Sequence, residues 1–273
     1  MPVRFPHPIK GLKKAYLLSV YTQRIVSGMN ATAVPASVTR GSLVEARGIY
    51  KSFGQTPALR GANVAVRQGE VFAIMGPSGS GKSTLLHCLA GIFTPDTGDV
   101  LFGGQPVNAM SEADRTKLRR TAFGFVFQFG QLVPELTAAD NVALPLLLNR
   151  TKRKVAYKTA AAWLGQLGIG DKGGRRTGEL SGGEAQRVAV ARALALAPKV
   201  IFADEPTGSL DSLTGEKTMD LMTDLARQQG VTVVIVTHEA RIAAYADRVA
   251  TVHDGVISSV DVPTAANAAR GVN

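Results

Sequence analysis

Cysteine is almost absent from this sequence. Cys88 is the one cysteine among 273 residues, so a disulfide framework within the chain is excluded and a cytosolic setting fits. Because the sequence places no base near this thiol, we expect Cys88 to be a small buried hydrophobe and not a nucleophile.

Long hydrophobic runs and clusters of metal ligands are also missing. No apolar stretch approaches the ~20 residues that a membrane-spanning helix needs, since Val142–Leu148 is short and contains Pro145. The four histidines are scattered and indicate no metal-ligand cluster. We therefore expect a soluble chain, or one that reaches a membrane through a partner.

Acidic residues are outnumbered, with 21 against 31 lysines and arginines, which gives a net charge of +10. Residues 1–28 carry five basic residues and no acid, so half of the excess lies there: Arg4, Lys10, Lys13, Lys14 and Arg24. The remaining basic groups, such as Lys152–Lys154 and Arg175–Arg176, are short and typical of solvated surfaces. The charge therefore does not favour a nucleic-acid partner.

A glycine-rich loop at residues 76–84 has the pattern glycine, four residues, glycine, lysine, then serine or threonine. The buried strand expected at Val71–Met75 precedes it and a helix expected at Leu85–Ala90 follows, which is the context that a phosphate-binding loop needs. Glycine backbone and a helix N-terminus both present N–H groups to phosphate oxygens. This context outweighs a chance glycine turn, and the candidate nucleotide-binding residues are Gly76, Pro77, Ser78, Gly79, Ser80, Gly81, Lys82, Ser83 and Thr84.

Both chain ends differ in composition from the middle. Residues 1–42 are expected to form a disordered basic extension, either a tail near a membrane or an artefact of start assignment with translation beginning at Met29, which we favour. Residues 15–21 suggest a signal peptide, but Thr22–Arg24 interrupts the run and a protein that needs ATP would find none outside the cell. Residues 261–273 form an alanine-rich tail that is expected to fray.

Between these ends, alternating and continuous apolar runs predict an α/β domain. The first two strands should be joined around Lys51–Gly54, and Asp254-Gly255 should form a hairpin. Residues 129–179 look like a helical insertion with turns at Pro134 and Pro145. The strands expected beside the loop strand are Val44–Tyr50, Ala58–Val66, Val100–Phe102, Phe123–Phe127, Val200–Ala203, Val231–Val236, Val249–Val252 and Val256–Val260. The further helices expected are Ser111–Arg120, Val155–Leu167 with a core Trp163, Val188–Ala197, Leu213–Gln229 and Ala240–Ala246.

Three buried strands end in polar residues that ligand chemistry could use. The glycine loop follows one, the acid pair Asp204-Glu205 ends the second, and Thr237-His238 ends the third. In an open α/β sheet, ligands bind at the carboxyl ends of the strands, so these groups should converge on one nucleotide. Ser181 and Glu184 have the spacing of a capping box, which would make a second glycine-fronted helix N-terminus.

Taken together, these motifs resemble the ATP-binding cassette (ABC) family over residues 43–260. The resemblance implies a P-loop NTPase cassette: a mixed central sheet, an N-terminal antiparallel β subdomain and an inserted α-helical subdomain at about 129–188. It also implies an ATPase that uses ATP and Mg²⁺. Ala185 departs from the glutamine that relatives often have, at a peripheral position.

The resemblance assigns a role to each motif residue. Phe53 would stack on adenine, where the family more often has tyrosine, and Glu205 would be the general base. His238 would contact the γ-phosphate, and Gln128 would touch both the metal and the attacking water. Mg²⁺ would be held by Ser83, Gln128 and Asp204. The signature residues would act on the ATP of a partner subunit in a homodimer with Asp211 in its contact loop: Leu180, Ser181, Gly182, Gly183 and Glu184.

The run Phe127–Val142 is similar to ATPases of the lipoprotein-release, macrolide-export and antimicrobial-peptide-resistance branch. This implies permease partners with large extracytoplasmic domains, and a cytoplasmic subunit held on the inner face of the membrane by them. A signalling complex that moves no cargo is the alternative. A nucleic-acid-handling ATPase would need a long coiled-coil or cysteine-rich insertion, and a translation factor would need a second cassette; neither is present.

Overall fold

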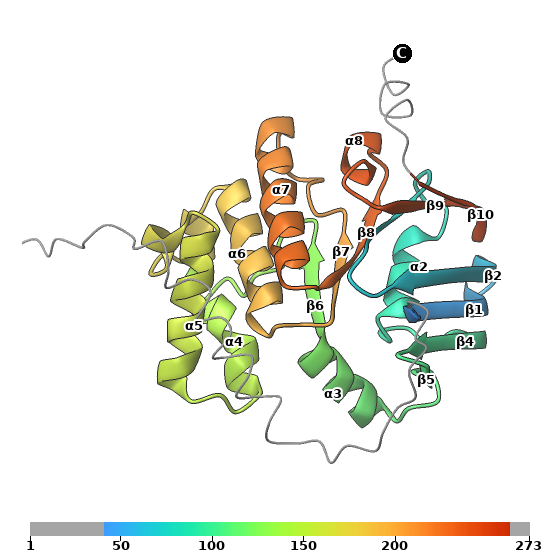
Figure 1. Ribbon diagram of the computed structural model, residues 1–273, viewed down its shortest axis with the longest axis horizontal. Coiled ribbons are helices and arrows are strands. Elements are labelled where there is room, and N and C mark those ends of the chain that lie inside the picture. Colours follow the sequence, from blue (N-terminus) through green and yellow to red (C-terminus); the bar gives the residue numbers. More distant parts are fainter. Residues whose placement is uncertain (1–40, 263–273) are drawn as a thin grey trace, which may run out of the picture. The chain divides into compact units, whose positions relative to one another are not determined.

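The computed structural model describes residues 41–262, so residues 1–40 of the predicted basic extension and 263–273 of the predicted alanine-rich tail lie outside this range, while Ser42 and Asp261 belong to strands. The described residues form two β-sheets with helices on both faces of the larger one (Figure 1). An α/β cassette with an antiparallel subdomain and a mixed sheet is therefore confirmed.

The smaller sheet is antiparallel, with the order β2-β1-β4-β5. Its long strands β1 (Ser42–Phe53) and β2 (Thr56–Arg67) alternate buried and exposed residues, as a half-buried sheet requires. The prediction of a joint at Lys51–Gly54 is wrong in part, because β1 continues to Phe53 and the turn is made by Gly54, at φ 60°, and Gln55. The shorter strands are β4 (Thr97–Phe102) and β5 (Gln105–Pro106).

The larger sheet has the order β10-β9-β3-β8-β7-β6, in which β10 is antiparallel to β9 and the other pairs are parallel. The register pairs Met75 with Thr237 and Phe127 with Asp204, so the polar residues that follow these strands share one edge. Asp254 and Gly255 both have positive φ, which confirms the predicted hairpin. The strands are β3 (Val71–Met75), β6 (Phe123–Phe127), β7 (Val200–Asp204), β8 (Thr232–Thr237), β9 (Arg248–His253) and β10 (Val256–Asp261).

Each face of the larger sheet packs into a different core. Along β3, Phe72 and Ile74 join the core shared with the antiparallel sheet and α2 (Lys82–Leu89), whereas Val71 and Ala73 join the core under the other helices. Cys88 lies in the first core and is buried, as predicted. The remaining helices outside the inserted part are α3 (Glu112–Ala122), α7 (Ser212–Gln228) and α8 (Ala240–Ala243).

The inserted part is built from α4 (Ala138–Leu148), α5 (Arg153–Gln166) and α6 (Gly182–Ala195). Trp163 is buried in its core, as predicted, but the expected turn at Pro145 is wrong. Pro145 lies inside α4, where Val142 and Leu146 are buried and Thr137 caps the helix in a reciprocal capping box. Tertiary burial and the cap therefore override the helix-breaking tendency of proline.

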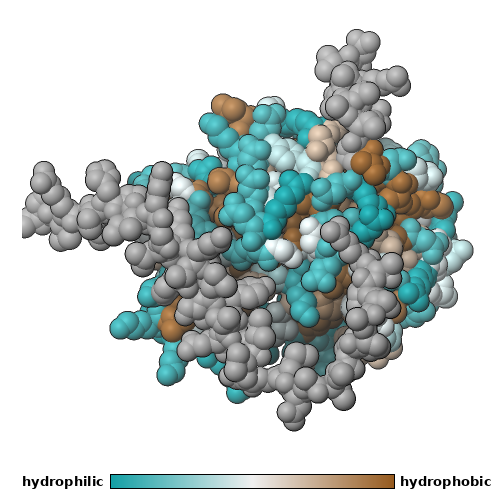
Figure 2. Space-filling model, viewed as in Figure 1, coloured by the Kyte–Doolittle hydropathy of each residue, from teal (hydrophilic) through white to brown (hydrophobic). Residues whose placement is uncertain are grey.

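The surface of the described residues in Figure 2 is largely hydrophilic, with a group of hydrophobic residues over β9 and β10. On β10, Val256 and Val260 are 43% and 40% exposed. Between residues 41 and 262, no helix combines the length and the hydrophobicity needed to cross a membrane.

Candidate active site

The phosphate loop follows β3 and holds a shape that only glycine permits at two positions. Gly76 and Gly81 have φ of 151° and 102°. A Cβ on Gly76 would lie 2.1 Å from the Val252 carbonyl oxygen, and one on Gly81 would lie 2.4 Å from that of Ala58. The loop therefore rests directly on backbone from β2 and β9, a close approach that glycine allows at these two positions.

Two buried polar groups of the loop fit a phosphate ligand. Lys82 is 6% exposed, and its Nζ donates to the Pro77 carbonyl at 2.7 Å. The buried Ser80 hydroxyl has no hydrogen-bond partner. Since α2 begins at Lys82 with Gly81 as its N-cap, a helix N-terminus adds its own N–H groups and partial positive charge. The donor set therefore suits the phosphates of a nucleotide.

Of the three candidate metal ligands, Ser83 and Asp204 lie side by side. The Ser83 hydroxyl donates to Asp204 Oδ1 at 3.0 Å, which places two hard oxygen ligands side by side as Mg²⁺ prefers. Gln128 directly follows Phe127, which pairs with Asp204 in the sheet. Its backbone carbonyl accepts from the Ser209 hydroxyl at 2.6 Å, and its side-chain amide lies close to Gly208. A conventional cluster of three or more histidine, cysteine or carboxylate ligands is not found among residues 41–262.

The acid pair continues in Glu205, which contacts the predicted histidine. His238 Nδ1 lies 2.9 Å from Glu205 Oε1, and the two side chains are 57% and 18% exposed. Glu205 has a φ of 46°, unusual for a residue with a side chain, and its N–H donates to the Val236 carbonyl of β8. The backbone thus turns sharply after Asp204, so that the second carboxylate meets the histidine.

The signature residues form the N-terminus of α6. Ser181 caps the helix by accepting from the Glu184 N–H at 3.3 Å, while Glu184 accepts from the Ser181 N–H at 2.8 Å. That second bond is the main reason why the pKa of Glu184 lies below its usual range. Leu180 packs partly against the core of the inserted part. The described residues show no hydrogen bond from Ser181 or Glu184 to the phosphate loop of their own chain.

The last two predicted site residues, Asp211 and Phe53, belong to different elements. Asp211 caps α7 by accepting from the Thr214 N–H at 3.0 Å, and hydrogen bonding to the Thr214 side chain first, and then to its N–H, holds the pKa of the Asp211 carboxyl below its usual range. A Cβ on Gly183 would lie 2.3 Å from the Thr214 methyl group, so the signature and the Asp211 turn are neighbours. Phe53 ends β1 in the other sheet and is 48% exposed.

Three polar side chains that bond the chain between the end of β6 and α4 were not predicted, of which Gln186 and Asn141 are buried and Arg192 is half-buried. Gln186 Nε2 donates to the Phe127 carbonyl at 3.0 Å, and Arg192 donates to the carbonyls of Gly130 and Gln131. Asn141 is fully buried and bonds the segment just before α4 through both ends of its amide. The spacing of Gln186 after Gly183 on one helix face was the available signal, whereas the other two depend on tertiary contacts.

A glycine loop at the carboxyl edge of a parallel sheet, with an acid pair on a neighbouring strand, defines a P-loop nucleotide hydrolase. The family described as ABC transporter matches residues 59–208, more than half of the chain. The chain belongs to this family, as an ATP-binding subunit with ATPase activity that powers a membrane transporter.

Several proteins of this family are similar to the chain over most of its length. The chain is 44% identical to the lipoprotein-releasing system ATP-binding protein LolD of Geobacter metallireducens, covering 78% of this chain and 97% of LolD. LolD of Roseobacter denitrificans is also 44% identical, over 80% of this chain and 98% of its own length. A solved dimeric ATP-binding cassette, MJ0796, bound to ADP and Pi in a post-hydrolysis state, is similar with a TM-score of 0.74. It is 38% identical over 80% of this chain and 98% of that one.

Proposed function

We propose that Glu205 is the general base of ATP hydrolysis in this chain. The observation that carries the proposal is the 2.9 Å contact between Glu205 and His238, directly after Asp204. Glu205 takes a proton from water, the water oxygen bonds to the γ-phosphorus, and the bond from that phosphorus to the bridging oxygen of ADP breaks. His238 orients the carboxylate and contacts the γ-phosphate.

Other residues of the edge bind and orient the nucleotide. Lys82 neutralises the β- and γ-phosphates, and the backbone of Gly76–Thr84 surrounds them. Ser83 and Asp204 would hold Mg²⁺, for which their 3.0 Å contact is the support, and Gln128 would contact the metal and the attacking water. When bound, Mg²⁺ offsets the charge that develops on the phosphates. The exposed ring of Phe53 stacks on adenine.

We further propose that two copies of the chain share two ATP molecules. The signature residues of one copy, with Ser181 at the helix N-terminus, would face the γ-phosphate held by the other, and Asp211 would contribute to the contact. Two observations support this: the signature makes no hydrogen bond to its own phosphate loop within the described residues, and the similar cassette MJ0796 is dimeric. Residues 43–260 would form this ATP-binding domain, and 129–188 its helical part.

The membrane partner is proposed to be a permease with large extracytoplasmic domains, as in lipoprotein release. This would place the subunit in the cytoplasm, on the inner face of the membrane. The LolD relatives support the branch. Phe129, which is 74% exposed next to Gln128, supports a docking surface there. Export or work outside the membrane is the transport mode that fits this branch.

The variant Glu205→Gln tests the catalytic assignment, because it keeps the side-chain volume and removes the base. We expect hydrolysis to fall by at least ~100-fold, the usual contribution of a general base, while ATP still binds and stabilises dimers. Turnover would be measured by phosphate release and dimers by light scattering. The control Glu216→Gln changes an exposed carboxylate on α7 and should hydrolyse ATP normally. Normal turnover in Glu205→Gln would contradict the assignment of the base.

A further inference from the structure

The segment Gly91–Asp96 connects α2 to β4 and lies against the end of β1 that carries Phe53. Asp96 Oδ2 accepts from the Ser52 N–H at 2.7 Å, and Oδ1 accepts from Lys51 Nζ at 2.8 Å. These bonds, that to Lys51 first, hold the pKa of Asp96 below its usual range. One carboxylate therefore fixes both the backbone and a side chain of the two residues just before Phe53.

The same segment contacts the Phe53 ring itself. Phe93 meets Phe53 edge to face, with centroids 5.4 Å apart and planes at 72°. Phe93 also meets His87 of α2 edge to face, at 5.2 Å and 85°. Burial lowers the pKa of His87, so this ring is neutral at neutral pH. A row of three rings thus joins Phe53 to the helix whose N-terminus forms the phosphate loop.

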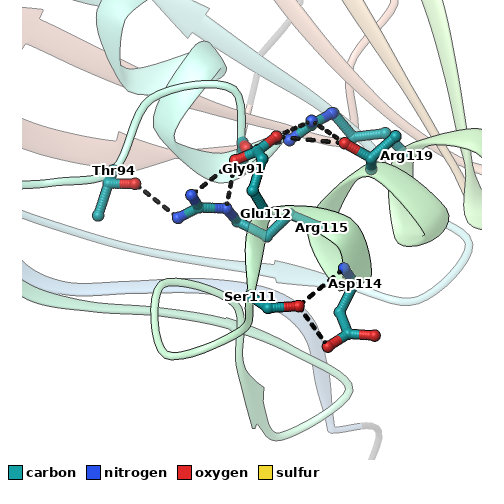
Figure 3. A network of polar contacts seen from close by, with 8 residues as sticks. Gly91, Thr94, Ser111, Glu112, Asp114, Arg115 and Arg119 are labelled. Carbon is teal, nitrogen blue, oxygen red and sulfur yellow. Dashed lines mark hydrogen bonds and ion pairs between the residues drawn. The ribbon is translucent and has the colours of Figure 1, made fainter.

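Helix α3 also holds the segment (Figure 3). Arg115 donates to the Thr94 hydroxyl at 2.6 Å, and Arg119 donates to the Gly91 carbonyl. Glu112 accepts from both arginines, which lowers its pKa to about 2 and keeps it ionised at neutral pH. The segment is therefore bonded to both β1 and α3, and it can serve as a rigid support.

From these contacts we propose that Phe93 and Asp96 are positioning residues for the nucleotide base. They hold Phe53 in the orientation in which its exposed surface stacks on adenine. The proposal rests on the assignment of Phe53 as the base-stacking residue. An unsupported aromatic ring at 48% exposure could turn about its side-chain bonds, and each bound base would then have to order it first. The support removes that cost before ATP arrives.

The test compares ATP with inorganic tripolyphosphate, which has phosphates but no base. In Phe93→Leu, we expect the Kd and KM for ATP to rise by about two- to tenfold, as the loss of an edge-to-face contact would produce. The kcat and the affinity for tripolyphosphate should stay unchanged. Phe53→Ala should show the same pattern more strongly. Asp96→Asn, at a half-exposed position, tests the second residue without a change in the core and should shift the ATP affinity in the same direction.

Phe102→Leu is the matched control, because Phe102 makes an equivalent edge-to-face pair with Phe123, at 5.0 Å and 84°. It should leave both affinities as in the unmodified chain. The proposal is overturned if Phe53→Ala weakens ATP while Phe93→Leu and Asp96→Asn do not, or if tripolyphosphate weakens in parallel with ATP. If Phe53→Ala itself leaves ATP binding unchanged, the assignment of Phe53 fails and this proposal fails with it.

Discussion

Single residues in this chain owe their behaviour to what surrounds them. Glu205 and Asp204 are adjacent carboxylates, yet one contacts His238 and the other contacts Ser83 of the phosphate loop. The backbone turn at Glu205, with φ of 46°, separates them. Strain of this kind is typical of functional sites, where the rest of the fold holds an unfavourable conformation in place.

Cys88 gives a prediction about reactivity and pH. Burial raises the pKa of its thiol to about 12, so we expect the folded chain to resist Ellman's reagent at pH 8 while the unfolded chain reacts. In the unfolded chain the thiol ionises at about 9, before it does so in the folded chain. The free energy of unfolding should therefore fall as pH rises above about 9, and be insensitive to Cys88 below that pH.

Denaturant titrations between pH 8 and 11 would measure this dependence. Cys88→Ala is the control, because it removes the thiol while leaving a small buried side chain, and the corresponding part of the pH dependence should disappear. Fast labelling of the folded chain at pH 8 would contradict the burial of the thiol.

At the scale of elements, the sequence predicts the fold where pattern and local chemistry agree. The strands Val71–Met75 and Phe123–Phe127 are found at their predicted bounds, since each is a short, mostly apolar run that a glycine or a polar residue ends. The turn predicted at Pro145 is wrong, because the burial that stabilises α4 comes from tertiary contacts. The contacts of Arg192 and Asn141 could not be predicted for the same reason, because their partners lie in other segments of the chain. Motif residues could be located from sequence, whereas their contacts could not.

Helix caps allow the local and the functional roles of Ser181 to be separated. Ser181 and Ser111 each cap a helix, accepting from the third following N–H at 3.3 and 3.2 Å. Changing either to alanine should cost about 1 kcal/mol of stability, the usual value of an N-cap. If Ser181 also acts on ATP, only Ser181→Ala should lower ATP hydrolysis at temperatures where both variants are folded.

Thermal unfolding and phosphate release measured on the same samples would check this. Equal loss of hydrolysis in the two variants would mean that stability alone explains the effect. No loss in Ser181→Ala would argue against a role of its hydroxyl at the nucleotide.

The whole molecule, in our proposal, works as a symmetric pair in which each ATP lies between two chains. Lys82→Ala removes the phosphate-binding side, and Ser181→Arg blocks the signature side. Either variant alone should be inactive. A mixture should regain activity, because the mixed dimer contains one intact site. That site combines the phosphate loop of the Ser181→Arg chain with the signature of the Lys82→Ala chain. Random pairing limits the recovery to about a quarter of the unmodified rate.

Phosphate release before and after mixing the two purified variants would measure this recovery. Mixing Ser181→Arg with itself at the same total concentration provides the control. If mixing restores nothing although light scattering shows mixed dimers, the site would have to be complete within one chain.

The support of the phosphate loop by β9 and β10 affects the order in which a growing chain becomes competent. Gly255 donates its N–H to the Ser80 carbonyl at 2.9 Å, and Gly76 lies against the Val252 carbonyl. A ribosome completes Gly76–Thr84 long before it reaches this hairpin. The nascent chain therefore carries the loop for most of its synthesis with the backing from β2 but without that from β9 and its turn to β10. ATP bound to the fully backed loop can stabilise the domain only once almost all of it has emerged.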